Sequence, residues 1–168
     1  MIDAHVLPGL PSTGPMADHL HMAGGPPWSE GHVIRFSDDA TSDLIVNFQN
    51  GNGYATKNIS WNDTGKFVII AKGASYFIHI SNRERSCFVC DFGIDCRITP
   101  DAKNAFVATY HDVLMISLTG DTCWRTHLAV DGIEFEDVGN DTIRCQIWMD
   151  PPDDWRAVSL SRANGEHG

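Results

Sequence analysis

A chain of 168 residues has the length of one folded domain, and its hydrophobic content of 42% is sufficient for a globular core. Its 22 acidic and 12 basic residues give a net charge of −10, which argues against nucleic-acid binding because that binding depends on clustered Lys and Arg. The longest uninterrupted apolar run, residues 67–71, is too short to span a bilayer. We therefore expect neither a nucleic-acid partner nor a membrane partner.

Residues 1–31 differ in composition from the rest of the chain, with five of the eight prolines and five glycines. Because proline lacks an amide donor and glycine raises the entropy of the unfolded chain, we expect an irregular arm here. The first fifteen residues have neither the positive charge nor the apolar core of a secretory signal. The expected location is therefore the cytoplasm, where the five cysteines would remain thiols.

From His32 onward, short apolar runs alternate with turn residues. Asn-Gly occurs twice within residues 49–53, and Asp131-Gly132 is a second strong signal for a chain reversal. No window of eleven or more residues has the apolar period of a helix. The pattern predicts an all-β domain over residues 32–161, followed by a polar tail at residues 162–168. Apart from the strands of residues 59–81 and 96–117, the predicted strands lie at residues 33–36, 44–48, 87–92, 123–130, 133–138, 143–148 and 155–160.

The middle of the chain contains two segments that resemble each other, residues 59–81 and residues 96–117. Each has an apolar lead-in, a turn that contains Asp, a strand-like run, a short polar break and a second run that ends in Ile-Ser. The two endings, at Ser81 and Ser117, lie 36 positions apart. A repeat of this period is typical of folds in which similar structural units follow one another along the chain.

The second segment resembles a blade of the YVTN type of β-propeller repeat. Its Pro-Asp-Ala-Lys at residues 100–103 corresponds to the family's Pro-Asp-Gly-Lys turn, and a strand follows from residue 106. The sequence departs from the family pattern at Ala102 (Gly in the family), Phe106 (Tyr) and Ser117 (Asp). The first segment fits more loosely, so the resemblance is confined to residues 59–118. It implies blade-like sheets and no particular activity, because propellers host unrelated functions.

We predict an all-β fold in which about three blade-like antiparallel sheets form a stack, as in part of a β-propeller, with a twisted β-sandwich as the alternative. A propeller blade takes roughly 40 residues and a closed ring needs at least about four blades, so residues 32–161 are too few to close a ring. Strand edges that stay open pair with other chains. We therefore expect a protein partner or self-association through open sheet edges, for example as a homodimer.

Few motifs in the sequence indicate catalysis. It has no Gly-x-Ser-x-Gly, no Walker A and no Gly-x-Gly-x-x-Gly motif, so no cofactor is predicted. His111 and Asp112 lie at the break between the two strands of the second segment, where a propeller would bind a ligand. His111 could form an acid–base pair with Asp95 or Asp101, in a pocket that also contains Asp112. The alternative interpretation of these residues is a polar surface turn.

The first candidates for a metal site are Cys87, Cys90 and Cys96, because thiolates bind zinc. Cys87 and Cys90 lie three positions apart in a strand-like run, which would direct them to opposite faces. We therefore predict buried thiols rather than a metal site. His19 and His21 of the N-terminal arm are a second candidate pair, for which solvated histidines are the favoured interpretation.

Trp124, Trp148 and Trp155 lie within or beside the predicted strands near the C-terminal end. We interpret them as packing residues, any of which could also line a binding surface, since Trp is enriched at interaction hot spots. The sequence as a whole predicts a non-enzymatic binding or interaction module. The alternatives are a small enzyme with a His/Asp pocket at the end of a loop and a Cys/His metal-binding protein.

Overall fold

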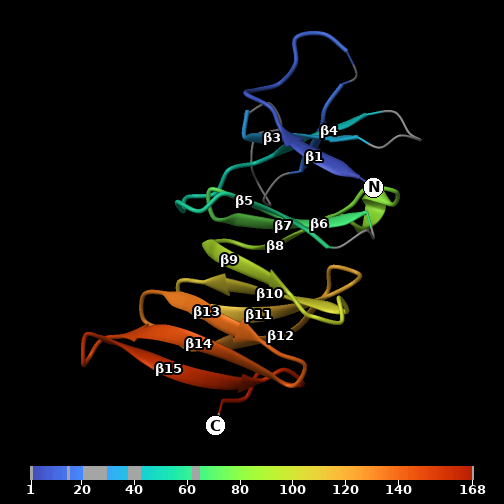
Figure 1. Ribbon diagram of the computed structural model, residues 1–168. Helices are drawn as coiled ribbons and strands as arrows, with labels where there is room; N and C mark the ends of the chain where they lie inside the picture. Colours follow the sequence, from blue (N-terminus) through green and yellow to red (C-terminus); the bar gives the residue numbers. More distant parts are fainter. Residues whose placement is uncertain (1, 15, 21–29, 38–42, 62–64, 168) are drawn as a thin grey trace. The chain divides into compact units, whose positions relative to one another are not determined.

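The computed structural model describes residues 2–14, 16–20, 30–37, 43–61 and 65–167, which Figure 1 colours along the chain. They belong to two compact units, Met1–Asp91 and Phe92–Gly168. The helical element in this part of the chain is a single 3-10 turn, η2 (Arg83–Arg85), and no described helix is long and apolar enough to cross a membrane. The prediction of an all-β fold is confirmed.

The first unit contains two four-stranded sheets, called sheet A and sheet B below. Sheet A has the strand order β1-β3-β4-β2, antiparallel except for the parallel pair β2–β4. Sheet B is a simple meander in the order β5-β6-β7-β8. The strands are β1 (Asp3–Val6), β2 (Asp18–Leu20), β3 (His32–Ser37), β4 (Leu44–Phe48), β5 (Lys57–Ser60), β6 (Lys66–Ala71), β7 (Ala74–His79) and β8 (Cys87–Cys90).

Alternate apolar residues of sheets A and B form the core of the first unit. Phe36 of β3 packs on Phe67 of β6 with 5.0 Å between ring centroids, and Phe48 of β4 packs on Tyr76 of β7 at 5.4 Å. The phenol of Tyr76 donates a hydrogen bond of 2.8 Å to the backbone carbonyl of Gln49. Burial raises the pKa of Tyr76, so this phenol stays protonated as a core residue with a satisfied donor.

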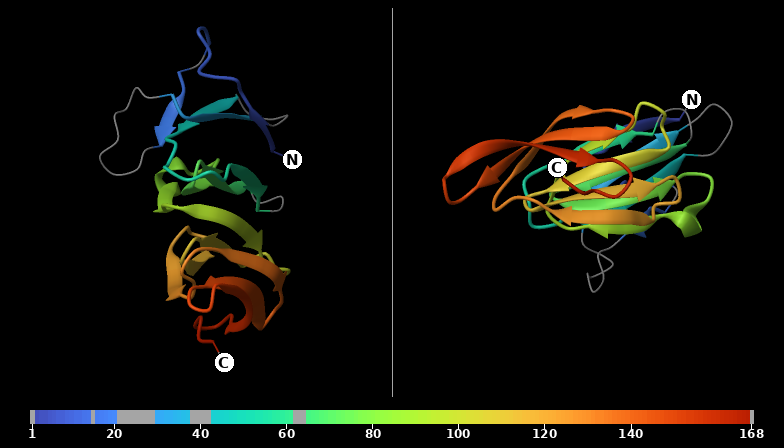
Figure 2. Two further views of the ribbon diagram at one scale, coloured as in Figure 1. Left: turned by 90° about the vertical axis from the view of Figure 1, so that its left-hand side faces the viewer. Right: turned by 90° about the horizontal axis from the view of Figure 1, so that it is seen from below.

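The second unit contains sheet C, in the order β9-β10-β11-β12, and sheet D, in the order β13-β14-β15. All of their strand pairs are antiparallel. In each unit the two sheets lie face to face (Figure 2). The strands of the second unit are β9 (Gly93–Ile98), β10 (Asn104–Thr109), β11 (Asp112–Ser117), β12 (Thr122–His127), β13 (Ile133–Val138), β14 (Thr142–Met149) and β15 (Asp154–Ser161).

The core of the second unit is formed by one face of each of its sheets. Phe106 and Met115 come from sheet C, and Ile133, Ile143 and Cys145 come from sheet D. Burial raises the pKa of Cys145 to about 12, so the thiol is a neutral packing group. Sheet D buries only this face: along β13 and β14, buried residues alternate with exposed ones.

The two similar segments of the sequence occupy corresponding strands of two different sheets. Residues 59–81 contain β6 and β7 of sheet B, and residues 96–117 contain β10 and β11 of sheet C. The turns before β6 and β10 share a backbone feature, since Gly65 (φ +68°) and Ala102 (φ +55°) both have positive φ. Ala102 therefore adopts a left-handed backbone conformation that glycine adopts more readily.

The number of sheets and the structure of the N-terminal arm differ from expectation. The structure has four sheets, where about three are predicted, and the N-terminal arm adds β1 and β2 to sheet A, whose other strands, β3 and β4, lie within the predicted all-β domain. Strand β1 is short, and it is held by long-range pairing such as Val6 with Ile34. Such pairing leaves little trace in the local sequence, where proline and glycine dominate.

Candidate interaction surface

The candidate catalytic residues lie at two different ends of the hairpin formed by β10 and β11. His111 and Asp112 lie at the tight turn that joins these strands, whereas Asp101 lies in the turn before β10. The six-residue strand β10 separates the two places. The structure therefore keeps His111 and Asp112 together and does not bring Asp101 to them.

Asp112 instead contacts two side chains of the edge strand β12. The strand register pairs Asp112 with His127 and Leu114 with Arg125, which places these side chains on one face of sheet C. His127 Nδ1 lies 2.9 Å from Asp112 Oδ1, and Arg125 donates two hydrogen bonds to Asp112 Oδ2. Sequence reasoning missed His127 and Arg125; their alternation with Trp124 and Thr126 along the strand was the available signal.

The electrostatics of Asp112 reflect two opposing effects. Partial burial by itself raises the pKa of this carboxyl group, but the hydrogen bonds and charges of Arg125 and His127 outweigh it and hold the pKa below its ordinary value. The ring of His127 lies 6.0 Å from the ring of His111, and the His127 side chain is 75% exposed. Asp112 thus orients an exposed imidazole, and it also ties the edge strand β12 to β11.

Four of the five candidate metal ligands lie on strands. Cys87 and Cys90 lie on β8, and Cys96 lies on β9. His19 lies on β2, and His21 lies outside the described residues. All five cysteines are described, and no disulfide joins them. Within the described part of the chain, no group of three or more His, Cys, Asp or Glu side chains could hold a metal ion.

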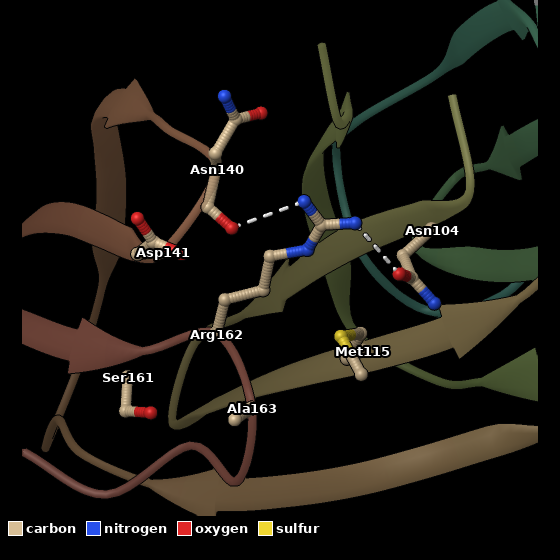
Figure 3. A pocket seen from close by; sticks show the side chains of 7 residues that line it. All are labelled: Asn104, Met115, Asn140, Asp141, Ser161, Arg162 and Ala163. Atoms are coloured by element: carbon tan, nitrogen blue, oxygen red, sulfur yellow. Dashed lines mark hydrogen bonds between the residues drawn. The ribbon is translucent and has the colours of Figure 1, made fainter. Parts of the chain in front are cut away.

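A solvent-open hollow of about 470 Å³ lies beside Arg162, between sheet C and the tail that follows β15 (Figure 3). The guanidinium of Arg162 bridges two turns: Nη2 donates to Asp101 (2.9 and 3.0 Å) and to Asn104 Oδ1 (2.9 Å), and Nη1 donates to the Asn140 carbonyl (3.1 Å). The hollow is lined by Asn104, Met115, Asn140, Asp141, Ser161, Arg162 and Ala163.

These bonds make Arg162 a fastening residue of the second unit. Hydrogen bonds from Thr99, from the Lys103 amide and from Arg162 lower the pKa of Asp101 to about 2, so Asp101 is ionised at neutral pH. Trp124 Nε1 donates to the Arg162 carbonyl at 2.9 Å, which uses the one polar group of that indole. Arg162 and Trp124 therefore hold the polar tail against sheet C.

Trp148 and Trp155 form a cross-strand pair on the outward face of sheet D. They are register partners on β14 and β15, and their rings pack edge to face with centroids 5.6 Å apart. Ile147, next to Trp148 on β14, and Val158, three positions after Trp155 on β15, pack against the core, so the alternation of each strand places both indoles outward. Trp155 is 39% exposed, which makes it one of the exposed large hydrophobic residues of the described chain.

The backbone groups of β15 also alternate: those of one residue face β14, and those of the next residue face away from it. The Arg162 amide bonds back to the Asp141 carbonyl, whereas the Ser161 amide points the other way, to Glu166. Counting back in steps of two, the backbone groups of Ser159 and Ala157 also point away from β14. Sheet D has three strands, while the other three sheets have four, so these groups lie along an edge that no described strand covers.

Acidic residues are concentrated around sheet D. Residues 131–168 contain nine acidic and three basic residues, so −6 of the net charge of −10 lies in this stretch. Two of its arginines are already paired: Arg144 with Asp137 and Arg162 with Asp101. The outward face and free edge of sheet D thus combine an exposed indole, open backbone groups and negative charge.

Comparisons with known proteins give little beyond this description. No protein-family model matches the chain, and no curated protein matches it. Among solved structures, a crystal structure of the N-terminal domain of Nup159 is similar over 99% of this chain, at 12% sequence identity and a TM-score of 0.46. The chain spans 49% of that structure's chain. A likeness of this degree decides neither the fold nor the function.

Proposed function

We propose that the chain is a non-enzymatic protein-interaction module that binds a partner polypeptide through sheet D. The observation that carries the proposal is the coincidence, on one sheet, of an uncovered strand edge with an exposed aromatic pair. Open strand edges are templates for pairing with another chain, and aromatic residues that are rigid and partly exposed provide binding energy at low entropic cost. Trp148 and Trp155 are held rigid because each packs against the other, and both are partly exposed.

The enzyme alternative is supported by the Asp112–His127 pair, which resembles an oriented acid–base group. Two features make it weaker than the interaction proposal. Arg125 also contacts this carboxylate, so Asp112 takes part in a structural ion pair. The described hollow of about 470 Å³ is lined by other residues, around Arg162. The hollow that could hold a substrate therefore lies in a different place from the Asp112–His127 pair.

Selection of random displayed peptides on the purified chain tests the interaction proposal. Enriched peptides should lose about tenfold or more in affinity for the Trp155→Ala variant, because truncation of a central aromatic residue removes a hot spot. Tyr54→Ala is the matched control, since Tyr54 is 93% exposed and belongs to the other unit. Peptides that bind Trp155→Ala as tightly as they bind the original chain would contradict the proposal.

A further inference from the structure

We infer that the partner segment is a short, basic, extended peptide that adds to β15 as the fourth strand of sheet D; this inference rests on the proposed function. Each of the other three sheets has four strands, and sheet D ends at β15 (Figure 1). A strand placed beside β15 would complete the pattern and satisfy the outward backbone groups of Ala157 and Ser159. Strand addition of this kind obtains affinity from main-chain hydrogen bonds and specificity from alternate side chains.

The free part of the edge is short and bounded at both ends. Towards the end of β15, the tail already occupies the edge: Leu160 pairs with His167, and the Ser161 amide donates to the Glu166 carbonyl. At the other end, the Trp155 amide is bonded to the Asp154 side chain. The open stretch therefore runs from residue 155 to residue 159, which is long enough for a short peptide strand.

Charge at both ends of this stretch identifies the chemistry of the occupant. Asp153 and Asp154 are exposed at the start of β15, and Glu166 is exposed beside its end. A strand with Lys or Arg near both ends would meet carboxylates at both ends. Between them, its central side chains on the outward face would lie beside Ala157 and Trp155, where a small or β-branched apolar residue fits.

A second copy of this chain fits the edge less well than such a peptide. Antiparallel pairing of two β15 strands about Ala157 would place Asp153 and Asp154 of one copy beside the Glu166 tail of the other. Like charges in such positions are destabilising, and the tail already occupies the space. The net charge of −10 on each copy adds long-range repulsion.

The probe for the test is the peptide acetyl-Lys-Lys-Val-Thr-Val-Lys-Lys-amide, with the same peptide carrying Glu in place of each Lys as the control. Binding is measured through tryptophan fluorescence at low and high salt. We expect the basic peptide to bind at least tenfold more tightly than the acidic one and to weaken as salt is raised, because the attraction is electrostatic. Equal binding of both peptides would overturn the inference about charge.

Amide hydrogen exchange of the full chain tests whether the peptide adds as a strand. In the unbound chain, the amides of Ala157 and Ser159 should exchange much faster than that of Val158, which is bonded to β14. Saturation with the basic peptide should slow Ala157 and Ser159 at least tenfold. Binding that leaves both amides unchanged would overturn strand addition, while Trp155-dependent binding of displayed peptides would still support the interaction function.

Two variants and two modified peptides address the same point independently. Ala157→Pro removes an amide that faces away from β14, so it should preserve the fold and abolish peptide binding. Tyr54→Ala, which changes an exposed residue of the other unit, should bind like the original chain. Two further peptides are compared, one N-methylated at its odd residues and one at its even residues. Only the peptide whose unmethylated amides face β15 should bind, and this test requires no change in the protein. Equal binding of the two peptides, or a concentration-dependent doubling of mass with protection of Ala157 and Ser159, would overturn the proposed occupant.

Discussion

Asp112 is the residue whose surroundings say most about how the second unit is held together. Its side chain is 10% exposed, and both of its oxygens accept hydrogen bonds from β12. An edge strand is covered on one side only, so a charged fastening of this kind replaces part of what a second neighbouring strand would give. Loss of the carboxylate charge should therefore be costly, because it leaves Arg125 and His127 without their acceptor.

We predict that Asp112→Asn lowers the free energy of unfolding by about 1.5–3 kcal/mol, the range for a hydrogen bond to a charged group. Urea unfolding followed by circular dichroism measures the change. Asp131→Asn is the matched control, since Asp131 is exposed, and it should shift stability by less than about 0.5 kcal/mol. An equal loss in both variants would show that the Asp112 contacts contribute nothing specific.

The pH dependence of stability should show the same contribution of the Asp112 carboxylate. The pKa of Asp112 is lower in the folded chain than the ordinary value for this side chain, so folding is favoured when the group is ionised. This contribution is fully present above the ordinary pKa, about 4, and is lost as the pH falls through the lower folded value. Below pH 4, the gap in stability between the original chain and Asp112→Asn should narrow. A gap that stays constant from pH 7 to pH 3 would argue against this linkage.

Gly132 shows how one backbone position supports the aromatic pair. It has φ +133°, and a Cβ atom placed there would lie 3.3 Å from Cη2 of Trp155. Both the backbone conformation and the indole therefore oppose a side chain. We predict that Gly132→Ala lowers the free energy of unfolding by about 1–3 kcal/mol, the cost of a strained backbone, and shifts the tryptophan emission spectrum. Unchanged emission and unchanged stability would mean that the indole and the turn can yield without cost.

At the scale of the element, the strands of the second unit differ in how many of their faces are buried. Strand β10 is buried on both faces from Ala105 to Thr109, whereas β15 is exposed over most of its length. Strand β14 has a strand on each side and is nevertheless buried on one face only, so a lateral neighbour is not the cause of this difference. The sequences differ in the same sense: β10 has no charged residue, whereas β15 contains Asp154 and Arg156.

Truncation of a core residue of β10 should reflect this difference. Phe106 is fully buried and lies 5.7 Å from the ring of Trp124, so we predict that Phe106→Ala costs about 3–5 kcal/mol. Phe92→Ala in the same unit should cost clearly less, because Phe92 is 44% exposed. Thermal unfolding of both variants provides the comparison. Similar losses at the two sites would contradict the description of this core.

The sequence predicted those elements whose signals are local. The alternation and turns of residues 66–79 and 104–117 indicate their hairpins directly, and Asp131-Gly132 marks the start of β13. The two tryptophans of sheet D were also identified as candidates. Features that depend on long-range register escaped prediction, because nothing local encodes them: the pairing of β1 with β3, the contact of Asp112 with His127, and the fastening role of Arg162.

At the scale of the whole molecule, charge is the property that most restricts the choice of partner. The chain has 12 basic and 22 acidic residues, and the acidic excess is greatest in the last 38 residues, around sheet D. Several arginines are not available to an outside anion, because each forms an ion pair with an aspartate of this chain. These are Arg35, Arg97, Arg125, Arg144 and Arg162.

We therefore predict that the chain does not bind nucleic acid. At 50 mM salt, where electrostatic binding is strongest, the chain should leave the electrophoretic mobility of a duplex DNA and of a single-stranded RNA unchanged, because phosphate binding requires unpaired, clustered cations. The basic peptide used to probe sheet D, added in the same buffer, is the positive control for electrostatic attraction to this protein. A mobility shift that disappears as salt is raised would show that a cationic surface exists despite the ion pairs. It would also contradict the argument that negative charge selects a basic partner for the open edge of β15.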